Sequence, residues 1–156
     1  MDDTERSRLF ALFAAKTEAS RDGCLIWHGA TSRGYGAIRS RGKVYYAHRI
    51  AWEMENGPIP EGAHIDHVCH TPACVNPGHL RAATPSQNIS NRSGAQSNSA
   101  SGIRGVFWDK SRERWVAHVR SNGKDVLRRR FDRLEDAALA AATARTEAFG
   151  EYAGNN

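Results

Sequence analysis

Residues 64–92 read HIDHVCHTPACVNPGHLRAATPSQNISNR, and nearly all the unusual chemistry of the chain lies in this stretch. It contains the pattern Cys-x4-Cys-x4-His, and the third cysteine of the chain lies well upstream. Three thiolates and one imidazole can surround zinc as a closed tetrahedral set, which is typical of structural zinc in a reducing compartment. We therefore predict a structural zinc site formed by Cys24, Cys69, Cys74 and His79.

Other interpretations of these four residues stay open. The thiols could be ordinary buried side chains, and the histidine a surface residue. A redox role has less support, because the chain contains no Cys-x-x-Cys motif. A zinc ion would stabilise a small domain whose apolar core is thin, because the free energy of metal binding adds to that of folding.

A role as general base is predicted for His67, which precedes Cys69 by two positions. It lies at the end of a strand predicted over residues 64–68, where a zinc-anchored backbone would hold the imidazole rigidly. A neutral histidine can deprotonate water near neutral pH, as hydrolysis of a phosphodiester requires. On the residues alone, His64 or His70 could take this role instead.

Oxygen ligands for a catalytic metal lie on either side of the cysteine pattern. Asn88, on a helix predicted over residues 85–91, offers a carboxamide oxygen, and Asp66 offers a carboxylate beside His67. Such oxygens, with substrate phosphate and water, are the ligands that Mg²⁺ prefers. An asparagine in a serine- and asparagine-rich segment is also an ordinary solvated or capping residue.

The same block resembles the HNH endonucleases of phage and intron origin, which share the ββα-metal fold. The resemblance rests on Asp66-His67-Val68-Cys69, Cys74-Val75-Asn76-Pro77, His79-Leu80, Thr84 and Asn88. More narrowly, the order His67-x-Cys69-x4-Cys74-x4-His79-x8-Asn88 resembles the His-Cys box branch of homing endonucleases. That branch has a second zinc cluster for which this chain has no cysteine left, so the resemblance covers only residues 24–92 or so.

The resemblance implies a role for each matching residue. It makes His67 the general base and Asn88 the ligand of a catalytic Mg²⁺, for which Mn²⁺ can substitute. It makes the three cysteines and His79 the ligands of structural zinc. Related HNH enzymes with an Asp-His pair use the aspartate as a second metal ligand, which would be Asp66 here.

An arginine near the scissile phosphate is also expected, since it would stabilise charge in the transition state. Arg49 is the first candidate, because Ala47-His48-Arg49 matches a segment that recurs in phage HNH proteins. Arg39 and Arg41, on a hairpin predicted before this segment, are equally basic. The alternative role for all three is contact with the phosphate backbone without catalysis.

A second domain is predicted after the small, polar stretch SGAQSNSAS, residues 93–101, which is typical of a flexible linker. Three strands are expected over residues 103–108, 114–120 and 126–131, followed by a helix over residues 134–149. This region resembles the AP2 DNA-binding domain. The resemblance rests on Ile103-Arg104-Gly105-Val106, Trp115-Val116-Ala117, Asn122-Gly123-Lys124, Phe131-Asp132 and Glu135-Asp136-Ala137-Ala138.

Alternation along the predicted strands separates two faces of this sheet. Trp115, Ala117, Val119, Leu127 and Phe131 should face the helix. Arginines and His118 should form the opposite face, which could contact base edges or phosphates, with Trp108 packing on the sugar backbone. A solvated sheet face would also be charged. The residues predicted to contact DNA are Arg39, Arg41, Arg104, Trp108, Arg114, Arg120, Arg128 and Arg130.

Charge and composition agree with a nucleic-acid partner. The chain has 156 residues and a net charge of +5, with a pI near 9.4. A basic protein is typical of nucleic-acid binding, although a solvated basic surface explains the charge equally well. No apolar run approaches the roughly 20 residues that a membrane span needs, and no signal segment is visible. We therefore expect a reducing cytoplasm, that of a bacterial host cell if the protein is phage-encoded.

Together these features predict an α+β protein, with a zinc-stapled ββα-metal nuclease module and a three-stranded antiparallel sheet covered by one helix. The predicted bounds are an N-terminal helix over 1–20, the nuclease module over 21–92, the linker over 93–101 and the DNA-binding domain over 102–156. The predicted activity is hydrolysis of phosphodiester bonds in double-stranded DNA with some site preference, by a monomer or a homodimer. The alternatives are a zinc-containing DNA-binding regulator with an inactive nuclease site, and an interaction module in which zinc only staples a scaffold.

Overall fold

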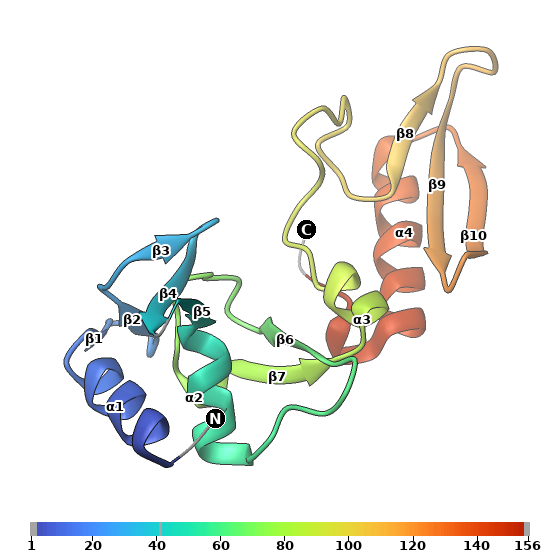
Figure 1. Ribbon diagram of the computed structural model, residues 1–156. Helices are drawn as coiled ribbons and strands as arrows, with labels where there is room; N and C mark the ends of the chain where they lie inside the picture. Colours follow the sequence, from blue (N-terminus) through green and yellow to red (C-terminus); the bar gives the residue numbers. More distant parts are fainter. Residues whose placement is uncertain (1–2, 41, 155–156) are drawn as a thin grey trace. The chain divides into compact units, whose positions relative to one another are not determined.

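The computed structural model describes residues 3–40 and 42–154 (Figure 1). The chain divides into two compact units, Met1–Ala83 and Thr84–Asn156. Each unit has a hydrophobic core of its own. The α+β class predicted from the sequence is confirmed. The boundary between the compact units precedes the predicted linker over 93–101. The bounds of the nuclease module and of the DNA-binding domain stay a prediction.

The first unit combines helices with short antiparallel sheets. Its strands pair as β1-β2, β3-β4-β5 and β6-β7. The predicted N-terminal helix is present as α1, which ends at Ala14, because Thr17–Ala19 form a strand, and the predicted hairpin is present as β4-β5, followed by α2. In chain order the elements are α1 (Asp3–Ala14), β1 (Thr17–Ala19), β2 (Leu25–Trp27), β3 (Thr31–Ser32), β4 (Tyr35–Ser40), β5 (Lys43–Tyr46), α2 (Ala47–Asn56), β6 (His64–His67), η1 (Pro77–His79) and β7 (Leu80–Ala83).

The core of the first unit gathers around Trp27, whose side chain is buried. Its ring packs against Phe13 of α1 with the centroids 5.8 Å apart, and its Nε1–H donates to the carbonyl oxygen of Ala30 at 2.9 Å. Gly36 of β4 approaches the ring so closely that a Cβ there would lie 2.7 Å from it. Ile50 of α2 joins the same core, and the β6-β7 hairpin lies against α2. The core therefore fixes the hairpin that carries His67.

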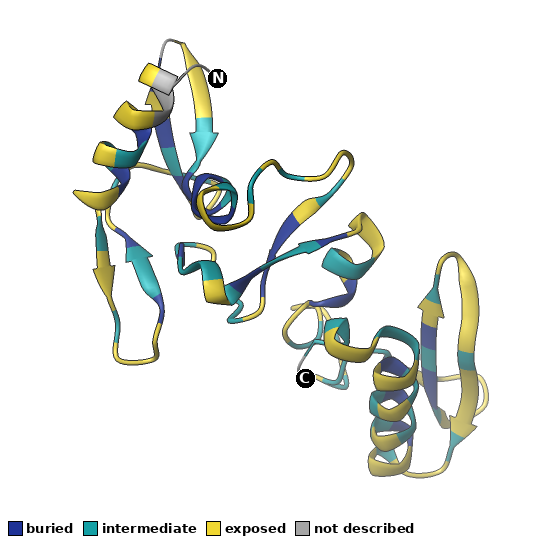
Figure 2. Cartoon of the chain, turned by 90° about the horizontal axis from the view of Figure 1, so that it is seen from below, coloured by how far each residue is buried: buried dark blue, intermediate teal, exposed yellow. Residues whose placement is uncertain are grey.

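The second unit contains a three-stranded antiparallel sheet in the order β10-β9-β8. Helix α4 packs on one face of this sheet and buries Ala137 and Ala141 there. Figure 2 shows buried parts of this unit in dark blue. The elements are α3 (Pro85–Ser90), β8 (Val106–Asp109), β9 (Arg114–Ser121), β10 (Lys124–Phe131), α4 (Leu134–Phe149) and η2 (Gly150–Tyr152). The predicted three strands and covering helix are confirmed.

The predicted division of the sheet into two faces is also confirmed. The core beneath α4 contains the side chains expected there, namely Trp115, Ala117, Val119, Leu127 and Phe131. The register pairs Leu127 with Val119 and Phe131 with Trp115, so these residues share one face. Arg128 and Arg130 alternate with these residues and therefore lie on the other face, whereas Arg129 is opposite Ala117 and lies on the side of α4.

Two local features complete the second unit. The turn between β9 and β10 has positive φ at both Asn122 (49°) and Gly123 (78°), as a two-residue type I′ hairpin turn requires. Strand β8 begins at Val106 rather than at the predicted residue 103. The Ser101 hydroxyl closes a turn before it, because it accepts from the Ile103 N–H at 3.1 Å and donates to the Val106 carbonyl oxygen at 2.6 Å. Within the described ranges, no helix is long and apolar enough to cross a membrane.

Candidate metal centre and nuclease site

The four predicted zinc ligands lie together in the first unit. The ligand atoms of Cys24, Cys69, Cys74 and His79 all lie within 4.8 Å of one another. His79 Nδ1 lies 3.5 Å from Cys24 Sγ and 3.6 Å from Cys74 Sγ. Zn–S bonds of about 2.3 Å and Zn–N bonds of about 2.0 Å, at the tetrahedral angle, place sulfur and nitrogen about 3.5 Å apart. The observed distances fit this value, so the group suggests a structural zinc site in which His79 binds through Nδ1.

Backbone pairing with β2 brings the cysteines together across a long stretch of sequence. The Val75 N–H donates to the Leu25 carbonyl oxygen at 2.7 Å, and Ile26 forms an antiparallel bridge with Cys74. The loop around Cys74 therefore pairs with β2 through an isolated bridge. Because Cys24 directly precedes β2, both sulfurs arrive at the same point.

Asn76 ties the histidine ligand to the same point. Its Oδ1 accepts the Gly78 N–H at 3.0 Å and so begins η1, the turn that ends at His79. Its Nδ2 donates to the carbonyl oxygen of Gly23 at 2.7 Å, directly before Cys24. One asparagine side chain thus links the turn that carries His79 to the segment that carries Cys24.

His67 is buried, with 7% of its surface exposed. Its Nε2 lies 2.9 Å from the carbonyl oxygen of Cys74. A carbonyl oxygen only accepts hydrogen bonds, so Nε2 carries the proton, and in the neutral ring Nδ1 keeps the lone pair. Burial holds the pKa of His67 below its usual value, against the opposing effects of the Cys74 carbonyl and Asp66. The imidazole is therefore held neutral and in one tautomer, the form that a general base needs.

Cys74 thus takes part in both sites. Its sulfur belongs to the zinc group, and its carbonyl oxygen orients His67. Burial raises the pKa of its thiol to about 12, so without a metal the thiol stays protonated at neutral pH. Coordination to zinc would deprotonate it, because the metal is the largest local charge in such a site.

An aromatic cluster surrounds His67. The rings of His48 and Tyr35 lie 5.0 and 5.8 Å from its ring, measured between centroids, and Tyr46 lies 5.8 Å from His48. Burial, together with the charges of His67 and Arg49, lowers the pKa of His48 to about 3. Its Nδ1 is buried without a hydrogen-bond partner among the described residues. The sequence predicts no role for His48, although this residue forms the centre of Ala47-His48-Arg49.

Asp66 contacts an arginine across the β6-β7 hairpin. The two residues are directly opposite each other in the register, and Arg81 Nε donates to Asp66 Oδ2 at 2.9 Å. Successive side chains of a strand point to opposite faces, so Asp66 and His67 lie on different faces of β6. A role of Asp66 as metal ligand stays a prediction, while its observed contact is a buried ion pair.

The three candidate arginines of the first unit have different settings. Arg49 lies on α2 beside His48 and is partly buried, and Arg39 lies exposed on β4. Arg41 lies outside the described residues. Contact of any of them with a phosphate stays a prediction.

Asn88 lies on α3, in the second unit. The helix begins with a capping box, in which the Thr84 hydroxyl accepts the Gln87 N–H at 3.2 Å and Gln87 Oε1 accepts the Thr84 N–H at 2.8 Å. The Asn88 N–H donates to the Thr84 carbonyl oxygen at 2.9 Å. Because Asn88 and His67 belong to different units, their joint action on one metal stays a prediction.

The outer face of the β8-β9-β10 sheet is basic, as predicted. Arg114, His118 and Arg120 of β9 share this face with Arg128 and Arg130 of β10. Carboxylates lie among them: Asp125 contacts His118 Nε2 at 2.8 Å and Arg120 Nε at 3.2 Å, Asp109 contacts Arg130 Nε at 3.4 Å, and Asp132 contacts Arg114. These exposed pairs leave the face basic and orient several of its guanidinium groups.

Comparison with known proteins identifies the two parts of the chain. Residues 45–89 match the HNH endonuclease family, and residues 101–151 match the AP2 domain. The chain is 40% identical to Protein 3.8 of Escherichia phage T7 over 106 residues, which are 68% of this chain and 86% of that protein. The chain belongs to the HNH endonuclease family and carries an AP2 domain. Membership of these families implies a nuclease that binds DNA.

Other relatives match this HNH endonuclease over a smaller share of their own length. Protein 2.8 of phage T7 is 40% identical over 76 residues, 47% of this chain and 51% of that protein. An HNH endonuclease of Acanthamoeba polyphaga mimivirus is 30% identical over 123 residues, 79% of this chain and 63% of that protein. No solved structure matches the chain.

In the AP2 sheet, the aromatic residue on the basic face is not the one that the sequence predicts to contact DNA. Trp108 is opposite Trp115, which faces α4, and their rings lie 5.0 Å apart. The register therefore places Trp108 on the helix side and not among the arginines. Phe107, which is 45% exposed, is opposite Val116 and so lies on the basic face. DNA contact by Trp108 stays a prediction, and Phe107 is an exposed aromatic residue on that face which the sequence analysis missed.

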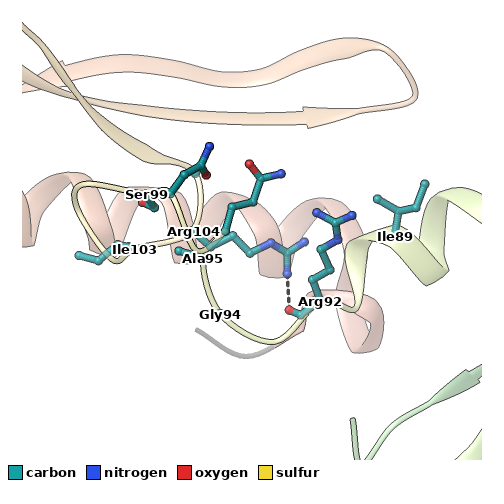
Figure 3. A pocket seen from close by; sticks show the side chains of 10 residues that line it. Ile89, Arg92, Gly94, Ala95, Ser99, Ile103 and Arg104 are labelled. Carbon is teal, nitrogen blue, oxygen red and sulfur yellow. Dashed lines mark hydrogen bonds between the residues drawn. The ribbon is translucent and has the colours of Figure 1, made fainter. Parts of the chain in front are cut away.

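Arg104 has contacts that the sequence did not indicate. It lines a pocket of about 320 Å³ together with Ile89, Arg92 and residues of the polar segment that follows Arg92 (Figure 3). Its guanidinium, however, donates to main-chain carbonyl oxygens within the second unit. DNA contact by Arg104 stays a prediction, and its observed bonds are structural.

Proposed function

We propose that this protein is a metal-dependent endonuclease that hydrolyses phosphodiester bonds of double-stranded DNA. The observation that carries the proposal is the bond from His67 Nε2 to the Cys74 carbonyl oxygen at 2.9 Å, inside the segment that matches the HNH family. It sets the tautomer of a buried, neutral histidine and so leaves Nδ1 as the basic atom.

In the proposed reaction, His67 Nδ1 takes a proton from the water that attacks phosphorus. The oxygen donors of Asn88, with Asp66 as a second candidate, suit a hard cation such as Mg²⁺ or Mn²⁺. Such a cation, when bound, would stabilise negative charge on the leaving oxygen. Arg49 is the candidate for contact with the scissile phosphate, because it lies beside His48 in the ring cluster around His67.

The basic face of the AP2 domain supports DNA as the substrate. Arginines that carboxylates hold in place can bond to guanine edges or to phosphates. We propose that this face binds the duplex and supplies some site preference. Cleavage of both strands by a homodimer is a further prediction. The mass of the protein–DNA complex tests whether two copies of the protein bind.

The decisive experiment is plasmid nicking by His67→Ala with Mg²⁺ present. Loss of the general base should lower the rate by about 10²- to 10⁴-fold. Zinc content and affinity for duplex DNA should stay at the wild-type level, because His67 belongs to neither function. Wild-type nicking by His67→Ala would refute its role, and lost DNA binding would show that the change acts through the fold.

A second candidate function is a zinc-containing DNA-binding regulator whose nuclease site is inactive. The bond between Arg81 and Asp66 favours it, because that carboxylate then serves the β6-β7 hairpin. A wild-type protein that binds duplex DNA but does not nick it with Mg²⁺ or Mn²⁺ would establish this function. Nicking that requires the metal would exclude it.

A further inference from the structure

Helix α3, which carries Asn88, is too short to hold itself in place. It has six residues, whereas isolated helices shorter than about 12 residues are marginal in water. The capping box satisfies its first turn. The carbonyl groups at and beyond its last turn need partners from elsewhere in the chain.

Arg104 supplies those partners. Its Nη2 donates to the Ser90 carbonyl oxygen at 2.7 Å, and its Nη1 donates to the Arg92 carbonyl oxygen at 2.7 Å. Figure 3 shows the second of these bonds, with the guanidinium reaching back to the segment that follows α3. Nη1 also donates to the Ala153 carbonyl oxygen at 3.1 Å. One guanidinium therefore joins the end of α3 to the C-terminal segment of the AP2 domain.

A second arginine holds the first. Arg145 of α4 is 5% exposed, and its Nη1 donates to the carbonyl oxygen of Arg104 at 2.6 Å. Burial, with the nearby charges of Arg145 and Arg92, lowers the pKa of Arg104, so the guanidinium lies in a partly desolvated setting. A charged group in such a setting is strongly bonded when its acceptors are fixed. The hydrogen bonds thus run from the core helix of the AP2 domain to α3.

Gly154 lies so close to Arg92 and Arg104 that a side chain would not fit at this position. A Cβ there would lie 2.4 Å from the Arg92 carbonyl oxygen and 2.8 Å from Arg104 Nη1. The residue also has a φ of +64°, which favours glycine. Backbone of the C-terminal segment can therefore approach the bonded group only because this position lacks a side chain.

We propose that Arg104 is a positioning residue for Asn88, holding α3 and its metal-binding side chain on the AP2 domain. The proposal rests on the role of Asn88 given under the proposed function. It gives Arg104 a different role from the DNA contact that the sequence predicts for it. The proposed metal ligand Asn88 is then held by the AP2 domain, while the proposed general base His67 lies in the unit that contains the candidate zinc ligands.

The first test is hydrogen exchange of the full-length protein, which needs no nuclease activity. The amide protons of Asn88 and Asn91 bond within α3, to Thr84 and Gln87, and report its stability. Arg104→Lys and Gly154→Ala should lower their protection at least about tenfold, while amides of β9 keep theirs. Arg92→Ala, which removes an arginine side chain from the same pocket but keeps the acceptor carbonyl, should leave α3 unchanged. Unchanged α3 protection in the first two variants would overturn the proposal.

The second test is plasmid nicking as a function of Mg²⁺ concentration. Arg104→Lys and Gly154→Ala should each lower kcat by about 10- to 100-fold and raise the Mg²⁺ concentration at half-maximal rate, as loss of an outer-shell partner does. KM for DNA and the Kd for duplex should stay at the wild-type level. Arg92→Ala should nick like the wild type.

Two outcomes separate the possible failures. If Arg104 instead grips a phosphate, Arg104→Lys should keep most of kcat and Arg104→Ala should weaken DNA binding, because lysine replaces arginine as a point charge but not as a fork. That result would overturn the proposal. If Asn88→Ala nicks like the wild type, the role of Asn88 in the proposed function is wrong, while hydrogen exchange still decides whether Arg104 holds α3.

Discussion

His67 and Asn88, the two residues proposed to act in catalysis, have different surroundings. His67 belongs to a hairpin whose neighbouring loop is drawn together by three cysteines and a histidine, and its ring is bonded to Cys74 of that group. Asn88 belongs to a six-residue helix whose end is bonded by Arg104. Elements this short need an external hold. A candidate zinc group lies beside one of them and the half-buried guanidinium of Arg104 bonds the other, so the two should respond differently to chelation and to pH.

Removal of zinc should have the most severe consequence. A zinc-selective chelator, followed by restoration of Mg²⁺, should abolish nicking, because the Cys74 loop would no longer hold His67. Structural zinc contributes directly to folding free energy, so amide protection in the first unit should fall as well. Hydrogen exchange and zinc analysis measure both effects.

The control for this experiment lies within the same chain. Amides of β9 and α3 should keep their protection, since Arg104 requires no metal, and Cys69→Ser should reproduce the chelator without touching Mg²⁺. Full nicking by zinc-free protein would show that the cluster does not support the catalytic histidine.

Acid should weaken the first unit through His48. Its pKa falls from 6.5 to about 3 on folding, so the folded state binds fewer protons than the unfolded state below pH 6.5. The stability it contributes is present above pH 6.5 and is lost as the pH falls toward 3. In His48→Phe, the drop in Tm between pH 7 and pH 5 should be smaller by roughly 5 °C, measured by thermal unfolding.

An exposed histidine provides the comparison for His48. His28 lies in the same unit, and its side chain is 57% exposed. It forms an ion pair with Glu18, which is also exposed. His28→Gln should keep the wild-type acid sensitivity. Equal acid sensitivity of His48→Phe and the wild type would mean that burial of His48 does not govern it.

The smallest effect is expected on the outer face of the AP2 sheet. Asp132 and Arg114 form a pair whose side chains are 74% and 49% exposed, and exposed pairs contribute little to stability. Asp132→Asn should change Tm by less than about 2 °C. It should tighten binding to random-sequence duplex a few-fold at low salt, since it removes a negative charge from the face.

Salt dependence supplies the control for that change. The gain in affinity should vanish in high salt, where charges on the surface are screened. An equal gain at all salt concentrations would mean that Asp132 affects DNA binding by another route than charge. Thermal unfolding and fluorescence anisotropy are the two measurements.

Much of this architecture was predictable from the sequence, because it depends on patterns among residues that are close together in the chain. Alternation along 114–120 and 126–131 predicted which residues of the AP2 sheet face α4, since successive side chains of a strand point to opposite faces. Cysteine and histidine spacing predicted the metal group, and the structure brings all four residues together. Thr84, Pro85 and Gln87 form a start signal for α3 that depends only on neighbours in the chain.

Other features depend on partners far apart in the sequence. The pairing of Asp66 with Arg81 follows from the register of β6 and β7, and the place of Trp108 from its position opposite Trp115. The sequence predicts a DNA contact for Arg104, which lies within the strand expected over residues 103–108. Its acceptors at Ser90 and Ala153 become visible only when the chain is folded.

The sequence alone determined the family resemblance, the fold class and the four candidate zinc ligands, because periodicity and ligand spacing are local properties. Tertiary structure alone decided how the functional side chains are held. The tautomer of His67, the neutral state of His48 and the attachment of α3 to Arg104 all depend on carbonyl groups and burial that arise from packing. No spacing of residues encodes a hydrogen bond to the main chain of a distant segment, and both His67 and the end of α3 take part in such bonds.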